Sequence, residues 1–93
     1  MYSRAEQLNR NTRILVNYIH PLAAGIIAEW IIEFDFKLKI KKERRSRMGD
    51  YRPALEYRNH VITINRNLNP HAFLITLVHE VAHLKTFITH GAS

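Results

Sequence analysis

Three side chains near the carboxyl end of the sequence carry its clearest chemical signal. His79 and His83 are four positions apart, and Glu80 directly follows the first of them. On a helix this spacing places both imidazoles on one face, with Cβ atoms about 5–6 Å apart, so that two ring nitrogens can converge on one zinc ion. Zinc lowers the pKa of a bound water toward about 7. Glu80 can reach that water without occupying the metal, so the pattern predicts a zinc site with Glu80 as the general base of peptide hydrolysis.

The same residues also have a structural explanation. His79 and His83 can be core histidines that bond to backbone carbonyls, with Glu80 in a salt bridge. We favour the metal because unpaired buried polar groups cost about 1–3 kcal/mol each. The final helix is apolar around nearly its whole circumference, so these three polar side chains need partners there, and one metal site satisfies all three. The identity of the metal stays open, since imidazole also binds cobalt, nickel, copper and iron.

A catalytic zinc site takes a third protein ligand and a water. His90 is the nearby candidate for this ligand, but on a continuing helix it lies about 10 Å beyond His83. Gly91 after it is typical of a helix C-cap, where His90 would instead interact with the helix dipole. The other histidines are more often surface or core residues than ligands: His20, His60 and His71.

Hydrophobic periodicity and turn chemistry predict the elements that must position these residues. Asn69 is a good N-cap and Pro70 suits the first helical position, so the final helix is predicted over residues 70–89. Its apolar residues surround it, which predicts burial on all sides. Before it we expect helices over 4–18 and 21–32, an alternating strand over 34–41, a long loop over 42–57 with a short strand around 54–57, and a strand over 60–65.

Length and composition favour one soluble domain. The chain has 93 residues, of which 46% are hydrophobic and 24% charged, and it has no cysteine. No disulfide can form, and any metal must be held by His, Asp or Glu. The amino terminus has no secretory signal, and the most apolar stretch, interrupted by Glu29 and Glu33, is shorter than a membrane span. We therefore expect a cytoplasmic protein with no membrane partner.

The net charge of +6 is concentrated in one segment. Eight of the fourteen lysines and arginines fall between Lys37 and Arg52, against Glu43 and Asp50. Such a segment attracts nucleic acid or another acidic surface, although it is also typical of a solvated strand face and loop. A non-catalytic module that binds DNA or RNA through Lys37 to Arg52 is therefore the alternative to the enzyme.

Beyond the motif, the sequence resembles the bacterial SprT-like zinc metalloprotease family over more than half of its length. The resemblance runs from Phe36 to Leu84 in the family's order. Its segments are Phe36-Lys37-Leu38-Lys39-Ile40, Gly49-Asp50-Tyr51-Arg52-Pro53, His60-Val61-Ile62-Thr63-Ile64-Asn65, Leu68-Asn69-Pro70-His71-Ala72-Phe73-Leu74 and Leu77-Val78-His79-Glu80-Val81-Ala82-His83-Leu84.

The resemblance implies an α+β, minimal zincin-like fold with two N-terminal helices, a small sheet of two or three strands and a C-terminal metal-binding helix. It implies His79 and His83 as ligands to one Zn²⁺, Glu80 as the catalytic base and a protein substrate. Relatives in the wider family include Spartan-type proteases, which act on proteins crosslinked to DNA, a role that the basic segment would suit electrostatically.

One departure from the family pattern concerns the third ligand. The family places its third histidine in a Pro-His-Gly segment well after the helix, whereas here His90-Gly91 comes early and lacks the proline. We therefore expect residues 1–93 to form a single, C-terminally truncated domain without that ligand, and whether the enzyme is active in this form stays open. Truncation would expose apolar surface and favour a homo-oligomer. A third interpretation is a degenerate domain whose two-histidine site serves assembly.

Overall fold

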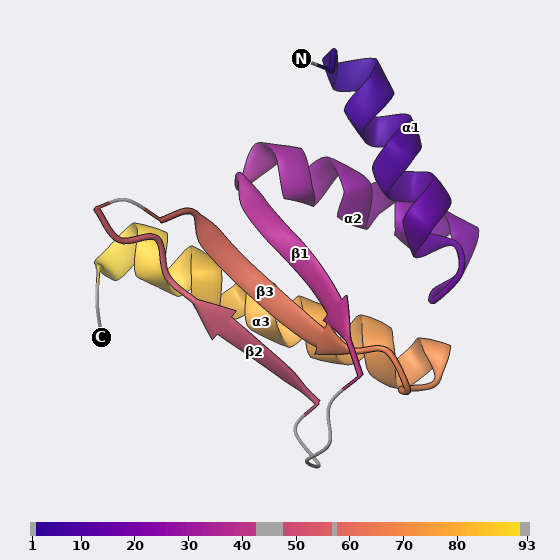
Figure 1. Cartoon of the computed structure of the whole chain (residues 1–93). Helices are drawn as coiled ribbons and strands as arrows, with labels where there is room; N and C mark the ends of the chain where they lie inside the picture. The colour runs from indigo at the N-terminus through magenta and orange to yellow at the C-terminus, as the bar shows by residue number, and fades with distance from the viewer. Residues whose placement is uncertain (1, 43–47, 57, 92–93) are drawn as a thin grey trace.

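The computed structural model of the chain describes residues 2–42, 48–56 and 58–91, which form three helices and one sheet (Figure 1). The elements are α1 (Arg4–Leu15), α2 (Pro21–Glu33), β1 (Phe36–Lys41), β2 (Gly49–Arg52), β3 (His60–Asn65) and α3 (Pro70–His90). The chain is therefore α+β, with two N-terminal helices, a mixed three-stranded sheet and a long C-terminal helix.

Helix α1 begins where the sequence predicts and ends three residues early. The Ser3 hydroxyl is its N-cap and accepts a hydrogen bond from the Glu6 amide at 3.2 Å. The prediction of a helix to residue 18 is wrong because Asn17 turns back onto the helix. Its side-chain amide donates to the carbonyls of Arg13 and Ile14, which satisfies them in place of a further helical turn.

Helix α2 starts directly after this turn. His20 has the extended backbone that a following proline imposes, and its Nδ1 accepts a hydrogen bond from the amide two residues on. Phe34, which the alternation places in the strand, is instead the C-cap of α2. Asp35 then turns the chain into β1 with a φ of 51°, a left-handed conformation that aspartate tolerates better than most residues.

The sheet has the strand order β1-β3-β2, with β1 parallel and β2 antiparallel to β3. The predicted strand His60–Asn65 is confirmed as the central strand. The short strand predicted around residues 54–57 is wrong: residues 54–56 lie outside any strand, and residue 57 falls outside the described part of the chain. The segment that pairs is Gly49–Arg52, and Pro53, which has no amide hydrogen to donate, ends it.

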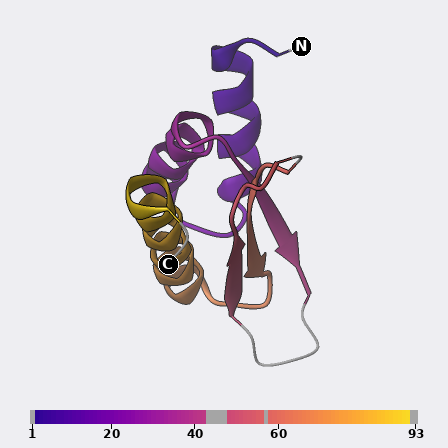
Figure 2. The same cartoon turned by 90° about the vertical axis from the view of Figure 1, so that its left-hand side faces the viewer.

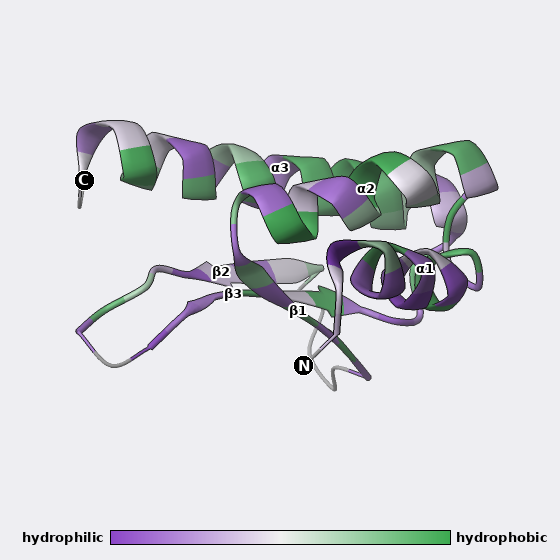
Figure 3. Cartoon of the chain, turned by 90° about the horizontal axis from the view of Figure 1, so that it is seen from above, coloured by the Kyte–Doolittle hydropathy of each residue, from purple (hydrophilic) through white to green (hydrophobic). Residues whose placement is uncertain are grey.

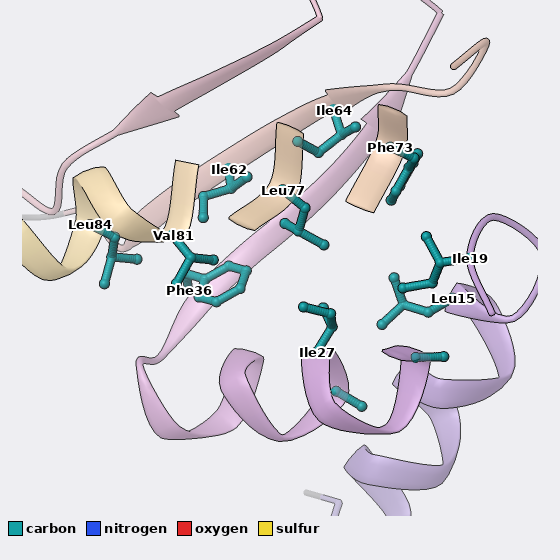
Figure 4. Packing of buried hydrophobic residues seen from close by; sticks show 12 residues of the cluster. Leu15, Ile19, Ile27, Phe36, Ile62, Ile64, Phe73, Leu77, Val81 and Leu84 are labelled. Carbon is teal, nitrogen blue, oxygen red and sulfur yellow. The ribbon is translucent and has the colours of Figure 1, made fainter. Parts of the chain in front are cut away.

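Helices α2 and α3 lie on one face of the sheet, and no described helix covers the other face (Figures 2 and 3). The hydrophobic core fills the space between these layers (Figure 4). Burial of each large side chain contributes roughly 1.5–3 kcal/mol to folding. The largest fully buried residues come from every layer: Leu15, Ile27, Ile62, Ile64, Phe73, Leu77 and Leu84.

Helix α3 is buried along one face only, so the prediction that it is buried on all sides is wrong. Its N-cap is Asn69, as predicted, whose side chain accepts a hydrogen bond from the Ala72 amide at 2.8 Å. The outer face is open because a three-stranded sheet covers one side, and it leaves Ile75 54% and Val78 42% exposed. By length and composition alone α3 could also cross a membrane, as core helices of soluble proteins can, but here it packs on β2 and β3.

Candidate metal centre

His79 and His83 converge on the outer side of α3, one turn apart. Their Nε2 atoms are 3.1 Å apart and their ring planes are perpendicular, with centroids 4.6 Å apart. Both residues are exposed, which corrects the expectation that the pair is enclosed by the apolar helix surface. At this distance one Nε2–H can donate to the lone pair of the other ring, so the two imidazoles also satisfy each other without a metal.

The separation of the two nitrogens fits one metal ion. Two nitrogens at 2.0–2.1 Å from a tetrahedral zinc lie about 3.3–3.4 Å apart. The observed 3.1 Å is about 0.2–0.3 Å shorter than that separation, so a small rotation of either ring would admit the ion. The two imidazoles are therefore close to the geometry that chelation of one ion would need.

Glu80 is the buried member of the motif, at 9% exposed. Among the residues that the structure describes, none forms an ion pair or a hydrogen bond with its carboxylate, so the salt-bridge explanation finds no partner here. Its oxygens are not fully enclosed. Because solvent reaches these oxygens, the carboxylate needs no protein partner, and it stays available for binding or proton transfer.

The Glu80 side chain opens onto a hollow of about 390 Å³ between α3 and β2, which we call the β2–α3 hollow. His83 reaches the same hollow from α3, one turn further along. The helix and the strand approach closely at Gly49, where an added Cβ would lie 2.6 Å from Thr76 Cγ2. The lining comes from both elements and the start of the loop after β2: Gly49, Asp50, Tyr51, Pro53, Glu80, His83, Thr86 and Phe87.

His60 contacts the residues that form the wall of this hollow and does not join His79 and His83. Its Nδ1 accepts hydrogen bonds from the Ala54 amide at 3.1 Å and from the Tyr51 hydroxyl at 2.8 Å. Because the backbone amide can only donate, the ring carries its proton on Nε2 and the tyrosine hydroxyl is the other donor. The His60 ring also stacks on Tyr51 and meets the edge of Phe87. Burial raises the pKa of Tyr51, which keeps its hydroxyl protonated.

The remaining histidines do not join the pair. His90 is the last residue of α3 and is exposed, about 10 Å along the axis from His83. His20 caps α2, and His71 is exposed in the first turn of α3. Within residues 2–42, 48–56 and 58–91, no three His, Asp or Glu side chains gather as a metal-binding group. The described residues therefore provide two converging imidazoles, which could act as ligands, and the carboxylate of Glu80.

Sequence reasoning missed the strand side of the site. Gly49, Asp50 and Tyr51 all fall in the segment 42–57, for which the sequence predicts a loop at these positions. The available signal was weak: the segment Gly49-Asp50-Tyr51-Arg52-Pro53 belongs to the resemblance, but it has too few apolar residues to indicate a strand by periodicity.

Comparison with known proteins adds no family to this description. A scan against protein-family models, a search of curated proteins and a search of solved structures each found no match.

Proposed function

We propose that the chain is a zinc-dependent peptidase of SprT type, with a protein substrate and a cytoplasmic location. His79 and His83 hold the metal, and Glu80 is the general base. The observation that carries the proposal is the convergence of the two Nε2 atoms, 3.1 Å apart, next to Glu80, a largely buried residue whose carboxylate no described residue pairs. When bound, zinc supplies the Lewis acidity that lowers the pKa of a water and polarises a carbonyl.

The other roles in the proposed reaction fall to side chains of the chain itself. Glu80 would take a proton from the attacking water and return it to the leaving nitrogen of the peptide, as a general base and then a general acid whose side chain lines the β2–α3 hollow. Tyr51, held by the hydrogen bond from its hydroxyl to His60, keeps the strand wall of the hollow in place. Hydrolysis needs one more protein ligand than these two histidines. On the continuous helix α3, His90 lies about 10 Å along the axis from His83, so it does not complete the site in this arrangement.

Metal content and cleavage test the two parts of this proposal separately. Purified protein freed of metal is dialysed against zinc, and zinc per chain is measured by mass spectrometry. We expect about one zinc ion per chain, and loss of that zinc in His79→Ala and in His83→Ala. His71→Ala is the matched control, since it removes an exposed histidine from the same helix and should keep the zinc.

Cleavage of fluorescent casein then isolates the role of Glu80. Glu80→Gln keeps the shape of the side chain and both histidines, so it should retain zinc and lose cleavage by about 10²–10⁴-fold. Wild-type protein that binds zinc through both histidines but cleaves nothing would refute the peptidase and leave a metal site that serves assembly. Zinc that survives both histidine substitutions would refute the metal centre itself.

A further inference from the structure

The face of the sheet opposite α2 and α3 carries an ordered set of cations. Alternation along β1 sends Lys37, Lys39 and Lys41 to this face, while the intervening residues enter the core. The strand register places Arg52 on the same face, because Lys37 and Arg52 both lie directly opposite Val61 of the central strand. Figure 2 shows this face free of the helices that cover the other one.

These cations border a hollow of about 750 Å³ over the central strand. Lysines of β1 form one wall, and Arg52 with Arg58 from the loop after β2 forms the other. The strands on either side of β3 are about 10 Å apart. The floor between them carries the short side chains of Thr63 and of Val61. We call this surface the basic groove, defined by Lys37, Lys39, Lys41, Arg52 and Arg58.

The positive charge of the basic groove is largely uncompensated. Asp50 is the carboxylate that lines it, and its pair with Arg52 at 3.3 Å is the one ion pair that the described residues form. Within these residues no carboxylate pairs with the three lysines or with Arg58. A surface that serves solubility alone mixes charges of both signs, whereas this one collects a single sign along a channel.

The arrangement of the charges indicates the shape of the anion. Alternate residues on a strand are about 6.4–6.8 Å apart, so the lysines form a line rather than a cluster that converges on one small ion. A line of positive charges beside an open channel suits a linear polyanion. Among the described residues that line the groove none is aromatic, so these residues offer bases no platform for stacking, and recognition would fall on the phosphates.

We propose that the basic groove binds the phosphodiester backbone of nucleic acid without sequence preference. It lies on the opposite face of the sheet from His79, Glu80 and His83, so nucleic acid and a ligand in the β2–α3 hollow can be bound together. The groove needs neither the metal nor the peptidase activity, and its test is therefore independent of the proposed function.

Fluorescence anisotropy of labelled DNA, single-stranded in one series and duplex in the other, tests the groove. Five phosphate contacts predict that log K falls with log salt concentration with a slope of about −4.5 for duplex and about −3.5 for single strands. Affinity should thus fall about 100- to 500-fold between 50 and 200 mM salt. Salt-dependent binding of either form of DNA supports the proposal. The ratio of the two affinities shows whether the groove prefers single-stranded or duplex DNA.

Charge-matched variants locate the binding surface. Replacing Lys37, Lys39 and Lys41 together by Gln should reduce the magnitude of the salt slope by about 2–3, while replacement by Arg should keep it. The control replaces Arg4, Arg10 and Arg13, exposed on α1, by Gln and removes the same net charge. His79→Ala should bind DNA as the wild type does.

Three results would overturn the proposal. The first is equal loss of affinity in the lysine and α1 variants, which would reduce the effect to net charge. The second is DNA binding that changes little with salt. The third is binding to phosphatidylserine vesicles with no measurable binding to either form of DNA.

Discussion

Strand β2 lies close to α3 at Gly49. This contact predicts whether an alanine at position 49 stabilises or destabilises the protein. Gly49 does not have a positive φ, so alanine is compatible with its backbone. In open space Gly49→Ala would stabilise the protein by about 0.4–1 kcal/mol, because alanine restricts the unfolded chain. The added Cβ would instead lie 2.6 Å from Thr76 Cγ2 and 3.1 Å from Ile64 Cδ1, well inside ordinary contact distances.

Relief of that contact must shift the Thr76 side chain, the strand or the helix, and Thr76 has little room to move because it is only 7% exposed. Overpacking of this kind costs about 1–3 kcal/mol, and the entropic gain offsets part of it. We expect Gly49→Ala to lower the free energy of unfolding by about 1–2 kcal/mol. Thr76→Ser removes the methyl group that blocks the new Cβ, so the double variant should recover most of the loss, with a coupling of about 1 kcal/mol or more.

Urea unfolding followed by circular dichroism measures these differences. Gly25→Ala is the matched control: Gly25 lies inside α2 with nothing within 4 Å of an added Cβ, so this change should stabilise by about 0.5–1 kcal/mol. If Gly49→Ala stabilises as Gly25→Ala does, or if Thr76→Ser rescues nothing, β2 does not lie against α3 as described. The β2–α3 hollow would then lose its strand wall.

Two further predictions concern the elements that hold the site. Asn69→Ala removes the N-cap of α3 and should cost about 0.5–2 kcal/mol in urea unfolding; an unchanged midpoint would contradict the cap. Tyr51→Phe removes the hydrogen bond to His60 and should cost about 0.5–1.5 kcal/mol at pH 7. Burial raises the Tyr51 pKa above its ordinary value of 10.0, so the associated stability is present below pH 10 and is lost as pH rises through the folded-state pKa. Urea unfolding from about pH 8 to pH 11 should show a smaller alkaline decline in the variant than in the wild type, and equal declines would count against this role.

Local signals predicted the parts of the fold that depend on neighbouring residues. The β-branched run His60–Asn65 and the Asn69-Pro70 helix start were found from the sequence because capping and strand propensity act over a few residues. Strand β2 was not found, since its four residues hold their place through pairing with β3 and contact with α3. These contacts join residues that are far apart in the sequence, so they produce no hydrophobic periodicity within the strand itself.

The same distinction applies to the candidate site. The four-residue spacing of His79 and His83 predicted that their rings converge, because helix geometry alone decides it. That spacing could not show that Glu80 is buried while both histidines are exposed. This difference depends on which side of α3 the sheet covers, and the apolar residues all around the helix concealed it.

Long-range ¹H–¹⁵N spectra of the histidine rings during a zinc titration test the central claim most directly. We expect one equivalent of zinc to shift the Nε2 resonances of His79 and His83, to leave His20, His60 and His71 unchanged, and to move His90 only if it is the third ligand. Zinc that leaves His79 and His83 unshifted, or that binds through other histidines instead, would contradict the metal centre on α3.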